Sequence, residues 1–375
     1  MAVGIVCEFS PCHNGHKYLI EQAKQISASR VVCAISGFFV QRGEAAFCPA
    51  KTRAEWAVSA GADLVLENPF PFSCATAEHF AKGAVSVLCG SGLCDMLAFG
   101  AEDGTENEFF ELAEILADKN TAKQIASVVK DNKNMSFAQA RVAYIHEKYG
   151  NISRLLCSPN SLLGVEYAKS ALMTGRNIKL IVIPRIGASH DGTPVNNISS
   201  ASYLRENADK IDIYHFCPDY VAEYFKQNSP FAINEKAYYT ALSAAILTRP
   251  TEEIALTAEL PHGYASRIID ACKKHSAFVG FFEEIKSKHL TNAHLRRMLI
   301  YLLTGVDADM LKSAPSSSRL LAFSDVGTKL LRQRKKDCEH FTVLSKLSDM
   351  KKLEGKELLR EQKALYAEKI FTRMA

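Results

Sequence analysis

The segment "GIVCEFSPCHNGHKYLIEQAK" (Gly4 to Lys24) places two histidines between two different hydrophobic patterns. Its first residues belong to an apolar run typical of a buried strand, and from Asn14 onward apolar residues recur at helical spacing. His13, Gly15 and His16 therefore lie at a strand-to-helix junction. In open α/β sheets, ligands bind at such junctions, beyond the carboxyl ends of the strands.

The residue types at this junction are suited to a phosphate group. The first turn of a helix has backbone N–H groups and a positive dipole end, and glycine lets that backbone approach a ligand closely. The imidazoles of His13 and His16 would add two hydrogen-bonding groups. The plain alternative is a pair of surface or core histidines without a ligand.

Residues 1–210 alternate between strand and helix patterns, which predicts a Rossmann-like α/β fold with a parallel sheet covered on both faces. The strands are expected at 2–9, 30–36, 63–70, 94–100 and 178–185. Between them, helices are expected at 14–26, 49–62, 73–90, 105–148 and 158–175.

After about residue 210 helical periodicity replaces this alternation. Helices are expected at 235–248, 262–275, 292–305, 319–337 and 349–374. We therefore predict two domains, at 1–210 and 211–375, the second mainly α-helical. Residues 1–210 carry a formal charge of −1 and residues 211–375 a charge of +5, so the second domain is the better place for a polyanion to dock.

The composition is that of an ordinary globular chain. Eleven cysteines occur without a C-x-x-C pair, and several lie within apolar runs, which favours buried, reduced thiols in a cytoplasmic protein. We expect no membrane span, because no apolar run approaches about 18 residues, and no dedicated metal site.

A second motif, "ISSASYLR" (198–205), follows the last expected strand of the first domain. Ser199 and Ser200 could cap a helix or hold phosphate oxygens, and Arg205 could add positive charge. Together, H-x-G-H and this serine–arginine helix resemble the signatures of the HIGH-type nucleotidylyltransferase superfamily. Its members transfer a nucleotidyl group from a nucleoside triphosphate.

Further blocks within about the first 205 residues resemble the bacterial tRNA(Met) cytidine acetate ligase family. They stand at 8–16, 36–46, 51–73, 99–102, 158–167 and 183–192. The chain departs from the family pattern at Ser10–Cys12, Phe38 and Asn68. These departures remove no histidine or arginine of the motifs.

The resemblance implies an ATP-dependent ligase that forms N4-acetylcytidine at the wobble position (C34) of elongator tRNA(Met). Acetate would attack the α-phosphate of ATP, and the resulting acetyl-adenylate would acylate the cytosine amine. Mg²⁺ would accompany ATP, held mainly by phosphate oxygens and water. His13 and His16 would be catalytic. The expected ATP-binding residues are Val6, Cys7, Glu8, Phe9, Ser10, Pro11, Cys12, His13, Asn14, Gly15, His16, Lys17, Tyr18, Leu19, Gly100, Asn160, Arg185, Ser199, Ser200 and Arg205.

Each residue carried over also has a purely structural explanation. Gly100 could be a turn glycine, Asn160 a helix cap and Arg185 a solvated charge at a strand end. The loop Gln41–Glu44 could gate the site, and Lys51 and Arg53 are possible contacts.

Clusters of basic residues in the second half of the chain could contact tRNA phosphates, or could simply be solvated. These basic clusters stand at 273–274, 296–297, 332–336 and 351–352. Two other functions remain open from the sequence. One is a small-molecule adenylyltransferase of the pantetheine-phosphate or nicotinamide-mononucleotide type, and the other is a non-catalytic tRNA-binding protein.

Overall fold

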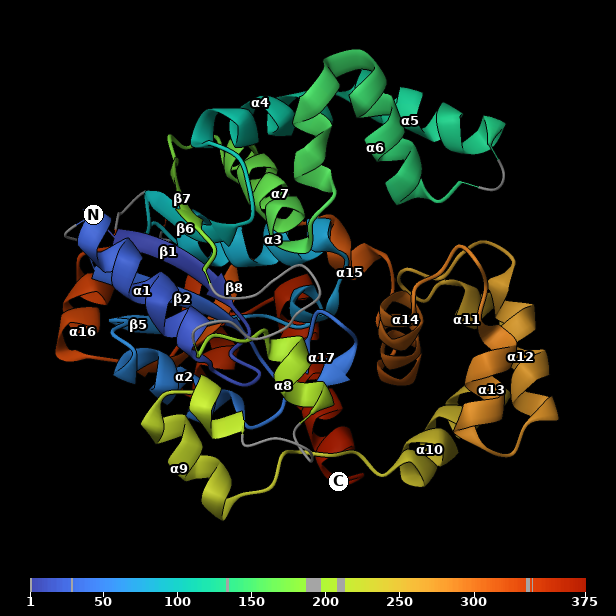
Figure 1. Cartoon of the computed structure of the whole chain (residues 1–375). Coiled ribbons are helices and arrows are strands. Elements are labelled where there is room, and N and C mark those ends of the chain that lie inside the picture. The colour runs from blue at the N-terminus through green and yellow to red at the C-terminus, as the bar shows by residue number, and fades with distance from the viewer. Residues whose placement is uncertain are drawn as a thin grey trace.

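A computed structural model describes residues 2–27, 30–132, 135–186, 197–207, 213–334, 338 and 340–375. Its main sheet has seven strands in the order β7-β6-β1-β2-β5-β8-β9 (Figure 1). The strands are β1 (Ala2–Cys7), β2 (Arg30–Ser36), β5 (Leu64–Asn68), β6 (Met96–Ala101), β7 (Lys179–Pro184), β8 (Ser317–Phe323) and β9 (Thr342–Leu344). The five expected strands are confirmed, and all five run parallel.

Strand β1 is the point where the order of the sheet reverses. The chain goes from β1 to β2 and β5 on one side, and it later adds β6 and β7 on the other side. The loops that leave β1 and β6 at their carboxyl ends therefore diverge, and a crevice opens between them. The H-x-G-H motif (His13–His16) follows β1 after a five-residue loop, 8–12, and lies at this crevice.

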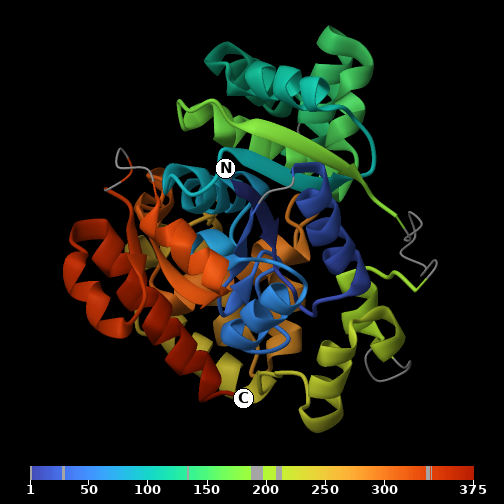
Figure 2. The same ribbon diagram turned by 90° about the vertical axis from the view of Figure 1, so that its left-hand side faces the viewer.

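Helices cover both faces of the sheet, each over its own hydrophobic core (Figures 1 and 2). One face carries α1 (Asn14–Ser27), α2 (Ala50–Ser59) and α9 (Asp219–Gln227). The other face carries α3 (Ala77–Val85), α4 (Glu106–Ala117) and α7 (Pro159–Met173). Helices α5 (Lys119–Asp131) and α6 (Phe137–Tyr149) extend the second layer beyond the sheet.

Gly164 sets the close approach of α7 to the sheet. A Cβ atom at this position would lie 2.4 Å from the ring of Phe99 on β6, which leaves room for no side chain. The small residue lets the start of α7 reach the end of β6, so that Asn160 lies next to the crevice.

The second half of the chain contains a helical bundle with its own core. It consists of α10 (Glu235–Leu247), α11 (Thr251–Ala255), α12 (Tyr264–Lys274), α13 (Phe278–Ile285) and α14 (Asn292–Thr304). The helices expected at 235–248, 262–275 and 292–305 are confirmed. Helix α17 (Gly355–Thr372) ends the chain and contacts both the bundle and the sheet layer.

The helix expected at 319–337 is wrong over its first residues. Residues Ser317–Phe323 form β8, which pairs antiparallel with β5, and helix α16 occupies only Asp325–Arg332. A short apolar run is compatible with either structure, and here the open edge of β5 decides for a strand. The division of the chain at residue 210 stays a prediction, while β8 and β9 extend the sheet of the first half.

The sequence predicts buried thiols and no helix that spans a membrane. Ten of the eleven cysteine side chains are buried, and Cys157 is exposed. Among the described residues, every helix falls short of the length and apolar character that crossing a bilayer requires.

Candidate active site

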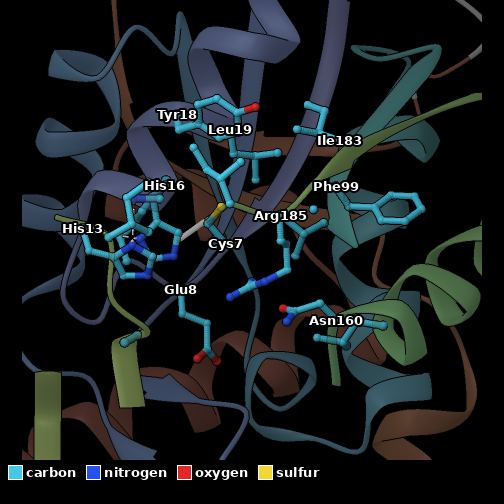
Figure 3. A pocket seen from close by; sticks show the side chains of 18 of the residues that line it. Cys7, Glu8, His13, His16, Tyr18, Leu19, Phe99, Asn160, Ile183 and Arg185 are labelled. Atoms are coloured by element: carbon cyan, nitrogen blue, oxygen red, sulfur yellow. Dashed lines mark hydrogen bonds between the residues drawn. The ribbon is translucent and has the colours of Figure 1, made fainter. Parts of the chain in front are cut away.

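A cavity lies at the crevice beyond β1, between the starts of α1 and α7 (Figure 3). Residues from β1, β6 and β7 line it, as does the segment before α8 (Ala201–Glu206). Its wall contains fourteen of the expected ATP-binding residues. They are Val6, Cys7, Glu8, Phe9, Ser10, His13, Gly15, His16, Tyr18, Leu19, Gly100, Asn160, Arg185 and Ser199.

Four expected residues of the first motif lie outside the cavity wall. Pro11 follows a cis peptide bond, and Cys12 is buried in the core beneath α1. Asn14 donates through its amide to the carbonyl oxygens of two later segments, at Asn197 and His215. Lys17 is exposed and pairs with the next turn of its own helix.

Ser199 of the second motif lines the cavity, whereas Ser200 and Arg205 stabilise the segments around it. The hydroxyl of Ser200 caps α8 by accepting from the backbone N–H of Tyr203. Arg205 lies outside the wall and donates to the backbone carbonyl of Ser10, 2.6 Å away. It therefore braces the loop of the first motif and adds positive charge behind it.

The two histidines stack on each other, with ring centroids 3.7 Å apart. The backbone N–H of His13 donates to Nδ1 of His16 over 3.2 Å, and the N–H of Gly15 donates to Nδ1 of His13 over 3.1 Å. Each neutral ring must then carry its proton on Nε2. Both side chains thus present Nε2–H donors, and Phe9 packs edge-on against His16.

Both imidazoles are neutral at physiological pH. Burial lowers the pKa of His16 to about 3, and the nearby Arg185 and Arg205 add to the shift. Burial also lowers the pKa of His13 well below its usual range, with further effects from His16 and the same arginines. Neutral rings can offer hydrogen bonds to a ligand, and Arg185 and Arg205 are the positive charges beside them.

Gly15 leaves the space that the ring of His13 occupies. A Cβ atom here would lie 3.0 Å from Cε1 and 3.1 Å from Nδ1 of His13, and 3.4 Å from Ile198. A side chain at this position would therefore displace the ring of His13 or the segment that carries Ser199.

Glu102, which the sequence analysis did not select, positions Asn160 and Arg185. Its Oε1 accepts from the amide of Asn160 and lies 3.7 Å from Nε of Arg185. Its Oε2 accepts from the hydroxyl of Ser158 and from the N–H and hydroxyl of Ser161. Although burial opposes ionisation, these hydrogen bonds lower the pKa of Glu102. Asn160 and Arg185 thus converge on the cavity from α7 and β7 (Figure 3).

Glu8 is the only acidic side chain among the described residues that line the cavity. The backbone N–H of Gln41 donates to its Oε1 over 2.7 Å. Burial raises the pKa of Glu8, despite that hydrogen bond and the nearby arginines. The carboxyl group joins the β1 loop to the turn that begins at Gln41.

Arg53, a possible contact from the sequence, lies outside the wall of the cavity. The side chain is completely buried, and its guanidinium donates to backbone carbonyls of Glu8, Ser36, Gly37 and Cys48. It therefore holds together the loops that follow β1 and β2. The neighbouring Lys51 is exposed, outside the cavity wall.

The loop Gln41–Glu44 is a tight turn between β3 (Phe39–Val40) and β4 (Glu44–Ala45). Gly43 has a φ of +75°, and a Cβ atom there would lie 2.6 Å from the backbone nitrogen of Arg297. The turn is therefore packed tightly against α14.

Ten further residues line the cavity and were not among the expected ATP-binding residues; most of them are apolar. They are Gln41, Phe80, Phe99, Leu163, Tyr167, Ile183, Pro184, Ile186, Ile198 and Ala201. Phe99 and Tyr167 form one wall, with ring centroids 5.8 Å apart. An apolar side chain by itself indicates burial, so the available signals were the family blocks that contain most of these residues and, for Phe99 and Ile183, positions near the ends of strands.

The basic clusters do not form one surface. The cluster at 273–274 lies on α12, and the cluster at 332–336 begins with the last residue of α16. Figure 1 shows these two helices at opposite ends of the molecule. Arg297 is buried in an ion pair with Glu259, so it is not available to phosphate. Residues 335–336 of one cluster, and 187–192 of the block at 183–192, lie outside the described residues.

Groups of three or more histidine, cysteine or acidic side chains that could hold a metal ion do not occur in the described part of the chain. At the cavity, only the carboxylate of Glu8 could contribute an acidic ligand among the described lining residues.

Comparison with known proteins gives concordant matches. The family model described as HIGH Nucleotidyl Transferase matches residues 1–374. A tRNA(Met) cytidine acetate ligase from Lysinibacillus sphaericus is 35% identical over 90% of this chain and 87% of its own length. The ligase of the same name from Streptococcus sanguinis is also 35% identical, over 92% of this chain and 89% of its own.

Two crystal structures of TmcAL from Thermotoga maritima match nearly the whole fold at 25% sequence identity. The apo form has a TM-score of 0.88 and covers 99% of this chain and 95% of its own. The form bound with alpha-thio ATP has a TM-score of 0.87 and covers 100% of this chain and 94% of its own.

Proposed function

The chain belongs to the HIGH nucleotidyl transferase family and, within it, to the tRNA(Met) cytidine acetate ligases. We propose on this basis that it is an ATP-dependent ligase that acetylates the wobble cytidine (C34) of elongator tRNA(Met). The observation that carries the proposal is the cavity at β1. There, two neutral Nε2–H donors and Arg185 converge where the family places its H-x-G-H motif.

The first step is the attack of an acetate oxygen on the α-phosphorus of ATP, with pyrophosphate as the leaving group. Charge builds up on the phosphate oxygens, and fixed donors that face those oxygens lower the barrier. We assign the Nε2–H groups of His13 and His16 to these oxygens. Because both rings are neutral, they need no proton transfer to act in this way.

Arg185 and Asn160 are assigned to the adenylate or acetate. Arg185 has the charge and geometry to bind a carboxylate or phosphate, and Glu102 fixes both side chains. The apolar wall of Phe99 and Tyr167 would accommodate the adenine ring. Arg205 and Ser200 support the loops behind the phosphates rather than contacting them.

The second step transfers the acetyl group. The N4 amine of cytosine attacks the carbonyl carbon of acetyl-adenylate, the C–O bond to AMP breaks, and the amine loses a proton. Mg²⁺ would neutralise negative charge on the phosphates. Among the described lining residues Glu8 is the single carboxylate, which is consistent with an ion held mainly by phosphate oxygens and water. We place the protein in the cytoplasm, where its tRNA substrate is found.

One assay tests the function against its alternatives. The protein is incubated with ATP, labelled acetate and bulk tRNA, and both labelled tRNA and pyrophosphate are measured. Label in tRNA together with pyrophosphate release supports the ligase. Pyrophosphate release that depends on another acceptor supports a small-molecule adenylyltransferase, and tRNA binding without pyrophosphate supports a non-catalytic binder. Either of the last two outcomes contradicts the proposal.

A further inference from the structure

A second cavity of about 420 Å³ lies between the sheet layer and the helical bundle. This volume falls within the roughly 300–1,000 Å³ of ordinary ligand sites, and such sites favour interfaces between structural units. The β3–β4 hairpin, the start of α10, and helices α8, α13, α14 and α17 form its wall. The lining residues are Gly43, Glu44, Ala45, Phe47, Arg205, Phe231, Ile233, Glu235, Tyr238, Phe278, Arg296, Ile300 and Phe371.

Five aromatic side chains contribute to this wall. Phe371 and Ile300 are buried at its floor, whereas Phe47, Phe231, Tyr238 and Phe278 are only partly buried. The ring of Tyr238 lies 5.5 Å from that of Phe278 and 5.7 Å from that of Phe371, so these three make a continuous apolar face. Protein interiors are normally close-packed, so an open space beside several half-buried rings favours a ligand with a flat, apolar face.

Polar groups are present at the same wall. Arg205 and Arg296 both line the cavity, and Arg296 forms an ion pair with Glu44. Planar guanidinium groups beside aromatic rings are the usual surroundings of unpaired bases in RNA complexes. The combination therefore suits a nucleobase better than a purely aliphatic ligand.

The second cavity borders on the candidate active site. Gln41 lines the first cavity, and Gly43 to Ala45 of the same hairpin line the second. Arg205 lines the second cavity and donates to the carbonyl of Ser10, which lines the first. An RNA strand that places one base at the adenylate would therefore bring a neighbouring nucleotide to the second cavity.

We propose that this second cavity binds an unpaired nucleobase of the RNA acceptor, next to the cytidine that is acetylated. The proposal rests on the proposed function, because it takes RNA to be the acceptor. It also gives the helical bundle a specific role, since α10 and α13 supply Tyr238 and Phe278, the aromatic wall that selects an unstacked strand.

The test uses elongator tRNA(Met) transcripts that carry the fluorescent base 2-aminopurine on either side of the wobble cytidine. Stacking on aromatic rings quenches this base, so the full-length wild-type protein should quench one of the two transcripts. Absence of quenching in both, with a tRNA that the protein binds, would overturn the proposal. This measurement depends on no variant.

Two variants locate the effect. Phe278→Ala should weaken tRNA binding by about tenfold or more and abolish the quenching, as expected for a lost base-stacking ring. Val279→Ala is the matched control, because Val279 is 61% exposed on the same helix and lies outside the cavity wall. Equal affinity and quenching in both variants would overturn the proposal.

A separate readout distinguishes this proposal from the proposed function. Acetate-dependent exchange of pyrophosphate into ATP needs no RNA and depends on the first cavity alone. If the wild-type protein lacks this exchange, the proposed function fails. If exchange is present but neither transcript is quenched, only the base-binding proposal fails.

Discussion

Replacing Glu102 with glutamine tests whether this residue positions the two side chains assigned to the adenylate. The glutamine oxygen can take the place of Oε2, which accepts from Ser158 and Ser161 and so caps α7. The new NH₂ group must then face Nδ2 of Asn160 and Nε of Arg185, which both point an N–H toward it. The substitution therefore keeps the cap, removes the partner of Arg185, and makes the Asn160 amide turn over or lose its partner.

The size of the effect follows from these contacts. A hydrogen bond to a charged group contributes about 1.5–3 kcal/mol. The side chain of Glu102 is 33% exposed, so solvent screening reduces this to about 1–2 kcal/mol. If the lost positioning acts on the transition state, kcat/KM for adenylation falls by about 5- to 30-fold. Because the helix cap remains, we expect Tm to fall by less than about 3 °C.

The assay is acetate-dependent exchange of pyrophosphate into ATP, measured over a range of acetate and ATP concentrations. Glu111→Gln on the exposed face of α4 is the control, since it removes the same charge from a site away from the cavity. A Glu102→Gln variant with the kinetics of wild type would refute the positioning role. If kcat/KM fell equally in Glu102→Gln and Glu111→Gln, the cause would be the change of net charge rather than lost positioning.

Three further outcomes follow from the site. Gly15→Ala should lower the exchange rate about tenfold or more, because the new Cβ would crowd the His13 ring, while thermal stability stays equal or rises, since alanine favours helices. Burial lowers the pKa of His16 to about 3 in the folded protein. Below pH 6.5 the unfolded chain therefore binds this proton more readily than the folded protein, and the free energy of unfolding falls from pH 6.5 toward pH 3. The titration of His16 contributes up to about 1.4 kcal/mol of this fall per pH unit. Urea unfolding at several pH values should show that His16→Asn lacks this contribution. Arg53→Met should destabilise the protein by about 3 kcal/mol or more, seen as a lower Tm, because several buried carbonyls lose their donor.

Each of these has a contrary outcome. Wild-type exchange in Gly15→Ala would mean that His13 has room to move without loss of function. An unchanged dependence of stability on pH in His16→Asn would mean that this ring is not held neutral by the fold. A Tm unaffected by Arg53→Met would mean that the loops after β1 and β2 do not depend on the guanidinium.

The first half of the chain was predictable because its signals are local. The apolar run of β1, the helical spacing after Asn14 and the intervening H-x-G-H all lie within about twenty residues. Parallel βαβ units then bring the carboxyl ends of the strands to one edge. The family resemblance implied that Gly100 and Arg185 bind ATP, and this common edge explains why both line one cavity with His13.

The second half was less predictable, and β8 shows the reason. Its apolar residues fit a helix as well as a strand, and the exposed edge of β5, some 250 positions earlier, decided between them. Arg53 is a second example. From the sequence it was one of two possible contacts near the site, and the loops around it place its guanidinium among backbone carbonyls.

The sequence by itself determined the type of sheet, the position of the motif at a strand-to-helix junction and the residue types available to hold phosphate. Tertiary structure alone decided which nitrogen of each histidine faces the cavity, that Glu102 holds Asn160 and Arg185, and that an aromatic cavity adjoins the site. The physical reason is the distance along the chain between the residues that interact. Strand and helix patterns depend on neighbours along the chain, whereas proton positions, buried charges and cavities depend on groups that only folding brings together.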